Sequence, residues 1–182
     1  MHIQLFSPRP LFLAAALAIA ATLTGCASPI QHANLIPATP AIQKQHATSV
    51  AVVAGGGGET TAAGKSNVSD VELQRAVAAA IAQSKVFSQV VEGKSGDYVL
   101  NVSVFNLVQP NMGFSFTVNV EMGWTLTRAD TGAIVWRESI KSAHTTGAGE
   151  AFAGVERLRL ATEGAIRANI QQGLEKLSRQ NL

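Results

Sequence analysis

The residues best placed to do chemistry form a glycine-rich stretch with a basic end, residues 58–66, which reads Gly-Glu-Thr-Thr-Ala-Ala-Gly-Lys-Ser. In a phosphate-binding loop, four residues separate the first glycine from Gly-Lys-Ser, and this length wraps backbone amides around the phosphates. Here five residues separate Gly58 from Gly64, and one of them is the acid Glu59. We therefore expect a loop that joins a strand to a helix and binds no nucleotide.

Metal-ligating and nucleophilic side chains are few. Beyond the N-terminal region the chain has His32, His46 and His144, at no spacing that suits a metal ion. The single cysteine is Cys26, no Gly-x-Ser-x-Gly motif is present, and the acids are scattered singly. Because no acid and base come together, we expect no catalytic residues, no metal and no cofactor, and predict that the protein is not an enzyme.

The first 25 residues have the pattern of a secretory signal peptide. The basic residue Arg9 precedes an apolar run, residues 11–24, which is shorter than the about 20 residues that a membrane-spanning helix needs. The segment that follows looks like the lipobox of bacterial lipoproteins and consists of Leu23, Thr24, Gly25 and Cys26. In such proteins cleavage precedes the cysteine, whose thiol carries a diacylglyceryl group.

We therefore expect residues 1–25 to be removed and Cys26 to hold the protein on a membrane. As the sole cysteine, Cys26 has no partner for an internal disulfide, which also favours lipidation. Ala27 follows instead of an aspartate, and by similarity to enterobacterial lipoproteins this implies the periplasmic face of the outer membrane. The alternative is an ordinary signal peptide followed by an incidental cysteine.

The charges of the chain are nearly balanced, with 14 lysines and arginines against 12 acids. The sequence shows no cluster of basic residues, so it lacks the electrostatic pattern of a nucleic-acid-binding protein. We expect no nucleic acid among the partners.

Residues 26–47 contain three prolines and show no hydrophobic periodicity. We interpret this segment as a flexible tether, which would hold the domain on the order of 25 Å from the membrane. The alternative is that Leu35, Ile36 and Ile42 fasten part of the segment to the domain.

Residues 114–127 alternate strictly between apolar and polar side chains, which predicts a long strand with one buried and one solvated face. The apolar row is Phe114, Phe116, Val118, Val120, Met122, Trp124 and Leu126. The polar row is Ser115, Thr117, Asn119, Glu121, Gly123, Thr125 and Thr127.

Two neighbouring segments repeat this pattern. Residues 98–105 alternate in the same way, and residues 134–141 do so less regularly, with Ile134, Trp136 and Ile140 on the apolar side. Turn-forming residues separate the three segments, which predicts an antiparallel meander. The apolar run at residues 48–54 predicts a buried strand, parallel to the strand that starts near Asp97 because a helix connects the two.

Two helices are predicted. Ser69 and Glu72 have the spacing of a capping box, in which each side chain would bond the other residue's amide, and the helix they open buries Leu73 and Val77. A closing helix over about residues 149–178 has apolar residues at helical spacing, starting with Phe152. Within it, Arg159 is expected to pair with the acids three residues before and four residues after it.

Several short segments resemble a group of bacterial envelope lipoproteins. The group includes the lipoprotein activators of penicillin-binding proteins, the curli-secretion lipoproteins and the amino-terminal domain of the Tol-system translocation protein. The resemblance covers about residues 48–145 and rests on residues 86–90, 97–100, 125–127 and 131–136. It implies a small α/β domain with helices on one face of a mixed sheet, a short strand after the first helix, and a binding or assembly role without catalysis.

Together these patterns predict a signal peptide over residues 1–25, a lipidated tether over 26–47 and one two-layer α/β (α+β) domain of order β-α-β-β-β-α over 48–182. The expected function is that of an accessory protein in envelope assembly that binds another envelope protein. The alternatives are an envelope enzyme acting on cell-wall or lipid substrates and a structural lipoprotein without a dedicated partner. The expected partner surface is the polar sheet face, with Ser115, Thr117, Asn119, Glu121, Thr125, Arg137 and Lys141. Alternatively, these residues reflect strand propensity alone.

Overall fold

The long alternating segment forms strand β4 (Phe116–Arg128) in a computed structural model, which describes residues 28–61, 65–93 and 95–182. The expected apolar row is buried from its second member onward, at Phe116, Val118, Val120, Met122, Trp124 and Leu126. Phe114 was expected to be buried as well, and this is wrong. The paired part of β4 begins only at Phe116, opposite Thr146, so Phe114 belongs to the preceding turn and is exposed.

The sheet has five strands in the order β2-β1-β3-β4-β5. Strands β3 (Tyr98–Val108), β4 and β5 (Ile134–Thr146) form the predicted antiparallel meander. Strand β1 (His46–Gly55) runs parallel to β3, as predicted, and the short strand β2 (Phe87–Val91) adds a parallel edge beyond it. The predicted mixed sheet is confirmed.

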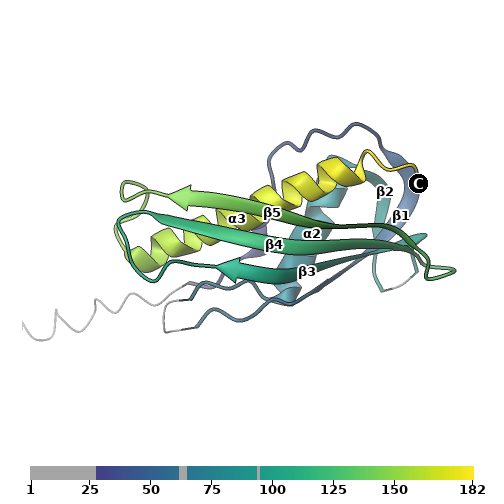
Figure 1. Cartoon of the computed structure of the whole chain (residues 1–182). Helices are drawn as coiled ribbons and strands as arrows, with labels where there is room; N and C mark the ends of the chain where they lie inside the picture. The colour runs from purple at the N-terminus through teal and green to yellow at the C-terminus, as the bar shows by residue number, and fades with distance from the viewer. Residues whose placement is uncertain (1–27, 62–64, 94) are drawn as a thin grey trace, which may run out of the picture.

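Helices α2 (Asp70–Ser84) and α3 (Gly154–Leu177) cover one face of this sheet, while no helix within the described residues covers the other face of the meander (Figure 1). Their buried side chains join those of the strands in one core, whose largest fully buried members include Trp124, Leu73 and Ile166. This is the predicted two-layer α+β arrangement. Within the described residues, neither helix combines the length and apolarity needed to cross a bilayer.

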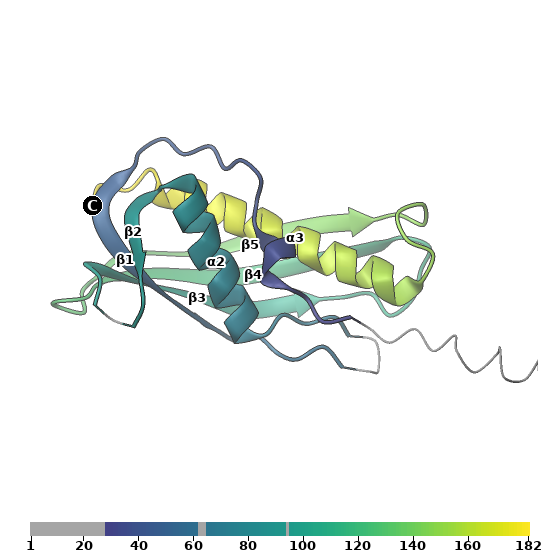
Figure 2. The same cartoon turned by 180° about the vertical axis from the view of Figure 1, so that it is seen from behind.

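The segment predicted to be a flexible tether is packed on the domain. The short helix η1 (His32–Leu35) lies between α2 and α3 and contacts both (Figure 2). Leu35 is fully buried and Ile30 nearly so, while Ile36 and Ile42 pack against the core. The prediction of a flexible tether over residues 26–47 is therefore wrong from Ile30 onward, and the alternative, in which apolar residues fasten it, is correct.

Polar contacts also hold η1 in place. Asn34 donates from Nδ2 to Oε1 of Glu163 at 2.9 Å, and Arg167 donates from Nε to the carbonyl of Asn34 at 3.0 Å. On the other side, Glu72 of α2 accepts from the backbone amide of His32 at 2.6 Å and lies 2.9 Å from its ring Nδ1. The N-terminal segment is thus bonded to both helices.

Helix α2 begins at the predicted cap, where Oγ of Ser69 accepts from the amide of Glu72 at 3.3 Å. The reciprocal bond expected from Glu72 back to Ser69 is absent among the described contacts, because the Glu72 carboxylate binds His32 and Arg75 instead. The helix ends at Lys85, whose φ of 56° is the left-handed conformation that closes many helices.

Helix α3 follows its predicted apolar stripe from Leu158 to Leu177, but it begins at Gly154 rather than near residue 149. Phe152, expected to be buried, therefore lies in the loop before the helix and is exposed. Arg159 contacts both Glu156 and Glu163, as predicted.

Strand β5 departs from its predicted pattern at its first residue. Ile134 was expected to face the core, yet it is half exposed, because the pairing of β4 with β5 shifts register between Leu126 and Thr127. Glu138, an acid on the helical side of this strand, contacts the ammonium group of Lys176 on α3.

Candidate functional site: the open face of the meander

The open face of the meander brings together six of the seven residues predicted for the partner surface. Thr117, Asn119, Glu121 and Thr125 lie on β4, in a row, while Arg137 and Lys141 lie on β5. The register places Thr125 opposite Arg137 and Glu121 opposite Lys141. Ser115, the seventh, precedes the strand and lies at its end. We call this surface the open face.

Several polar groups of the open face are already bonded to one another. Glu121 accepts from the hydroxyl of Ser139 at 2.6 Å, and its other carboxylate oxygen lies 3.6 Å from Nζ of Lys141. The hydroxyls of Thr117 and Thr145 are 2.8 Å apart. Arg137 forms no ion pair with any described residue and is exposed. Several side chains of this face are thus held in place, while the guanidinium group of Arg137 is exposed.

An aromatic side chain lies in the middle of the open face. Phe105 of β3 covers Gly123 of β4 so closely that a Cβ atom at Gly123 would lie 2.1 Å from the ring. The ring is nevertheless exposed over most of its surface. Both residues belong to the polar sides of their strands in the sequence, but their contact depends on the strand register, which places Gly123 opposite Ser103.

Beside Phe105 the open face contains a shallow groove of about 340 Å³. Strand β3 has a bulge between Val104 and Asn106, which turns Asn106 and Val108 to the same side as Phe105. The groove is lined by Asn106, Val108, Asn119, Val120, Glu121, Lys141, Ser142 and Ala143. Nothing in the amino-acid pattern indicates this bulge, so the groove and the apolar contribution of Val108 were not predicted.

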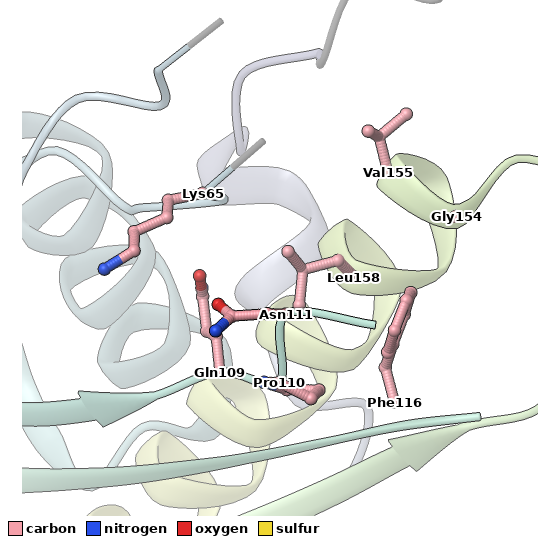
Figure 3. Close-up of a pocket in the computed structure, with 8 residues that line it drawn as sticks. All are labelled: Lys65, Gln109, Pro110, Asn111, Phe116, Gly154, Val155 and Leu158. Carbon is pink, nitrogen blue, oxygen red and sulfur yellow. The ribbon is translucent and has the colours of Figure 1, made fainter. Parts of the chain in front are cut away.

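A second cavity, of about 320 Å³, lies at one end of the molecule, where the turn after β3 faces the start of α3 (Figure 3). Its lining residues are Lys65, Gln109, Pro110, Asn111, Phe116, Gly154, Val155 and Leu158. Gln109 donates from Nε2 to the hydroxyl of Thr162 at 3.1 Å and to the carbonyl of Ser66, so its amide is engaged in the fold. The lining contains no carboxylate and no histidine, and therefore offers no acid and base pair.

The glycine-rich loop uses its backbone amides within the protein. Gly57 donates to the carboxylate of Asp70 at 2.7 Å and Gly58 to the carbonyl of Val68 at 2.9 Å. Lys65 points away from Phe116 and Val155 in the cavity (Figure 3). These contacts support the prediction that the loop binds no nucleotide, which stays a prediction.

The ionisable groups with shifted pKa values on α2 and α3 take part in structural contacts. On helix α3, Arg159 lies between two acids. The hydrogen bond between Arg159 and Glu156 is the main cause of two shifts, because it raises the pKa of Arg159 and lowers the pKa of Glu156. On α2, the backbone and ring of His32 lower the pKa of Glu72. In both places the shift reflects an ion pair or hydrogen bond that fastens helices or η1. Among the described residues, no three His, Cys, Asp or Glu side chains gather as they would around a metal ion.

The predicted lipidation motif, Leu23, Thr24, Gly25 and Cys26, lies outside the described residues. Its role therefore stays a prediction. The described chain starts at Ser28, two residues after Cys26.

No family model matches the sequence, and no curated protein matches it either. Solved structures do resemble the fold. Protein XCC0632 of Xanthomonas campestris, from the family DUF330, gives a TM-score of 0.58 at 12% identity, over 78% of this chain and 89% of that one. The hypothetical protein CT253 of Chlamydia trachomatis gives 0.54 at 6% identity, over 74% and 99%. A minor lipoprotein of Acinetobacter baumannii gives 0.47 at 12%, over 74% and 92%. At such identities the first two similarities show a shared fold.

Proposed function

We propose that the protein is a lipoprotein, anchored through Cys26 in the outer membrane with its domain in the periplasm, and that it binds another envelope protein through the open face without catalysing a reaction. The observation that carries this proposal is the placement of Phe105 on Gly123, in the middle of an uncovered sheet face. The sequence motif at residues 23–26 supports the anchor.

The open face has the physical properties of a protein-binding surface. Interfaces owe much of their affinity to a few central aromatic residues and arginines, surrounded by polar contacts that exclude water. Phe105 supplies an exposed ring and Arg137 an exposed guanidinium group on the same sheet face. Most other side chains of the open face are short, or are already hydrogen-bonded within the face, as Glu121 is to Ser139. Little conformational entropy is therefore lost when a partner orders them.

An enzymatic role finds less support. Catalysis by acids and bases needs two such groups directed into one cleft, commonly with shifted pKa values. The groove on the open face has one acid, Glu121, which is bonded to Ser139 and near Lys141. The shifted groups on α2 and α3, Glu72 and Arg159, serve in the contacts of helices and η1. Another pocket is lined by Asp97, Asp130 and Arg128, but hydrogen bonds from Ser49 and from Arg128 lower the pKa of the two acids, which disfavours a protonated acid catalyst there.

The anchor is tested by replacing Cys26. The Cys26→Ala variant should incorporate no labelled palmitate and should accumulate as an uncleaved precursor, whereas the wild-type protein is labelled and cleaved. Normal cleavage of the variant would show that Cys26 marks no lipoprotein processing site.

The binding surface is tested by reversing its charges. The double variant Arg137→Glu/Lys141→Glu, and separately Phe105→Ser, should reduce in-cell crosslinking to the partner several-fold while leaving the melting temperature nearly unchanged. A matched control reverses two exposed charges elsewhere, Lys44→Glu/Arg179→Glu, and should crosslink normally. If only the control variant loses the partner, the open face is not the binding surface.

A further inference from the structure

The three most exposed large apolar side chains of the described residues lie in two loops at one end of the domain. Met112 and Phe114, in the turn between β3 and β4, are 85% and 89% exposed, and Phe152, in the loop between β5 and α3, is 103% exposed. The two loops are neighbours, because Phe116 at the start of β4 pairs with Thr146 at the end of β5. We call residues 109–115 and 147–153 the tip loops.

The tip loop before α3 is held in place by Arg157 of that helix. Arg157 donates from Nη1 to the carbonyls of Ala151 and Phe152, each at 2.8 Å, and its guanidinium carbon lies 5.5 Å from the centre of the Phe116 ring. The loop before α3 is therefore fixed near the start of β4, and Phe152 is exposed on a loop whose backbone is held in place.

The tip loops are also almost free of charge. Their sequences are Gln-Pro-Asn-Met-Gly-Phe-Ser and Gly-Ala-Gly-Glu-Ala-Phe-Ala, with Glu150 as the one ionisable residue. The Glu150 carboxylate accepts from the amide of Gly147 at 2.7 Å, within the same loop. Exposed apolar side chains that gather on a surface of low charge commonly mark a binding site for a protein or a membrane.

The start of the described chain lies toward the same end as the tip loops in both views (Figures 1 and 2). Because Ile30 is buried and η1 is bonded to α2 and α3, Cys26 lies only four residues along the chain from a fixed point of the domain, with three residues between them. Four extended residues reach at most about 14 Å. A lipid on Cys26 would therefore hold this end of the domain close to the bilayer.

We propose that the tip loops dock into the surface of the bilayer that holds the lipid anchor, with Met112, Phe114 and Phe152 in the headgroup region. This inference rests on the proposed lipidation of Cys26. Phenylalanine and other apolar side chains stabilise membrane contacts at this depth. Strands β4 and β5 would then extend away from the membrane surface. The open face would be accessible to a periplasmic partner.

The experiment uses the full-length protein, purified after processing in cells and reconstituted in vesicles of phosphatidylethanolamine and phosphatidylglycerol that contain a spin-labelled lipid. An environment-sensitive maleimide dye is attached at Asn111→Cys in one tip loop or at Thr131→Cys in the turn at the other end of β4. Lipidation leaves Cys26 without a free thiol, so the wild-type protein takes up no dye. If the wild-type protein takes up dye, or if it fails to join the vesicles, the proposed lipid anchor at Cys26 is disproved. Either result is distinct from a failure of the tip loops to dock.

With the anchor in place, spin-labelled lipid should quench the dye at position 111 several-fold more than the dye at position 131. Adding Phe114→Ser and Phe152→Ser should abolish that difference, whereas Phe105→Ser, an equally apolar loss on the open face, should preserve it. Equal quenching at both positions, or quenching unaffected by the double substitution, would overturn the proposal. The dye at position 111 could instead show energy transfer to the same dye on another molecule, without quenching by the spin-labelled lipid. If that transfer disappears when more lipid dilutes the protein, the tip loops bind a second copy of this protein and not the membrane.

Discussion

The indole ring of Trp124 lies directly against Gly173, so that a Cβ atom added to the glycine would come within 2.4 Å of the ring. The same ring donates from Nε1 to Oδ1 of Asn169 at 3.0 Å, and Asn169 donates in turn to the carbonyl of Ile140 at 2.7 Å. One tryptophan thus fixes the distance and the rotation of α3 over β4 and β5. The position of the helix leaves the opposite face of the meander open.

Replacing Gly173 with alanine should destabilise the protein. The added methyl group would force the ring or the helix to move, and overpacking of this kind costs about 1–3 kcal/mol, which opposes the gain of about 1 kcal/mol in helix propensity. The matched control is Gly154→Ala at the start of the same helix, where the nearest atoms are 3.8 Å from the added carbon. Chemical denaturation that shows Gly173→Ala to be as stable as the control would contradict the close packing of α3 on Trp124.

The strand register predicts opposite results for two adjacent residues. Trp124→Ala should lower the free energy of unfolding by about 3–5 kcal/mol, because it opens a cavity and leaves Oδ1 of Asn169 without its donor. Thr125→Ala, on the open face, should change it by less than about 0.5 kcal/mol. Equal losses measured by urea denaturation would show that the two faces of β4 are assigned wrongly.

The packing of the N-terminal segment can be tested at Leu35. Its side chain is fully buried, so Leu35→Ala should cost about 2–5 kcal/mol. Ile134→Ala, which truncates a half-exposed side chain at the start of β5, serves as the control and should have little effect. A flexible tether would instead make the Leu35 variant indistinguishable from the wild type in thermal denaturation.

Glu72 predicts a dependence of stability on pH. Hydrogen bonds from His32 lower its pKa in the folded state below the ordinary value of 4.5. The ionised carboxylate therefore stabilises the fold above about pH 4.5, and this contribution is lost as the pH falls through the lower folded value. Glu72→Gln should be less stable than the wild type at pH 7, by up to about 1 kcal/mol, and the difference should shrink toward pH 3.

If the difference between Glu72→Gln and the wild type stays constant from pH 7 to pH 3, the charge of Glu72 has no part in holding η1. A variant of another acid, Glu92→Gln, which is exposed in the turn after β2, controls for general effects of charge.

The sequence predicted the sheet well because alternation depends only on the direction of successive side chains. It was wrong at Phe114, Phe152 and Ile134, which continue an apolar pattern beyond the residues where a partner strand or helix actually packs. Where an element ends is decided by its neighbours in space. Likewise, Ile30 and Leu35 show no periodicity, because their burial depends on the folded domain: η1, which ends at Leu35, lies between α2 and α3, and Ile30 joins the core.

The candidate site was predictable to the same degree. The polar rows on β4 and β5 followed from alternation, and the structure places them on one face. The contact of Phe105 with Gly123, and the turn of Val108 to the same side, depend on register and on a bulge in β3, neither of which a single strand reveals. A glycine within an alternating strand is the one sign in the sequence that another group approaches closely there.

The central claim, that the open face binds a partner in the envelope, is tested most directly by photo-crosslinking in living cells from one position on each face. A photoreactive side chain at Asn119, exposed on the open face, is compared with one at Gln171, exposed on α3. We expect a discrete crosslinked protein from position 119 and none from position 171, with loss of the product in the Phe105→Ser background. A product from position 171 alone, or equal products from both, would contradict the claim.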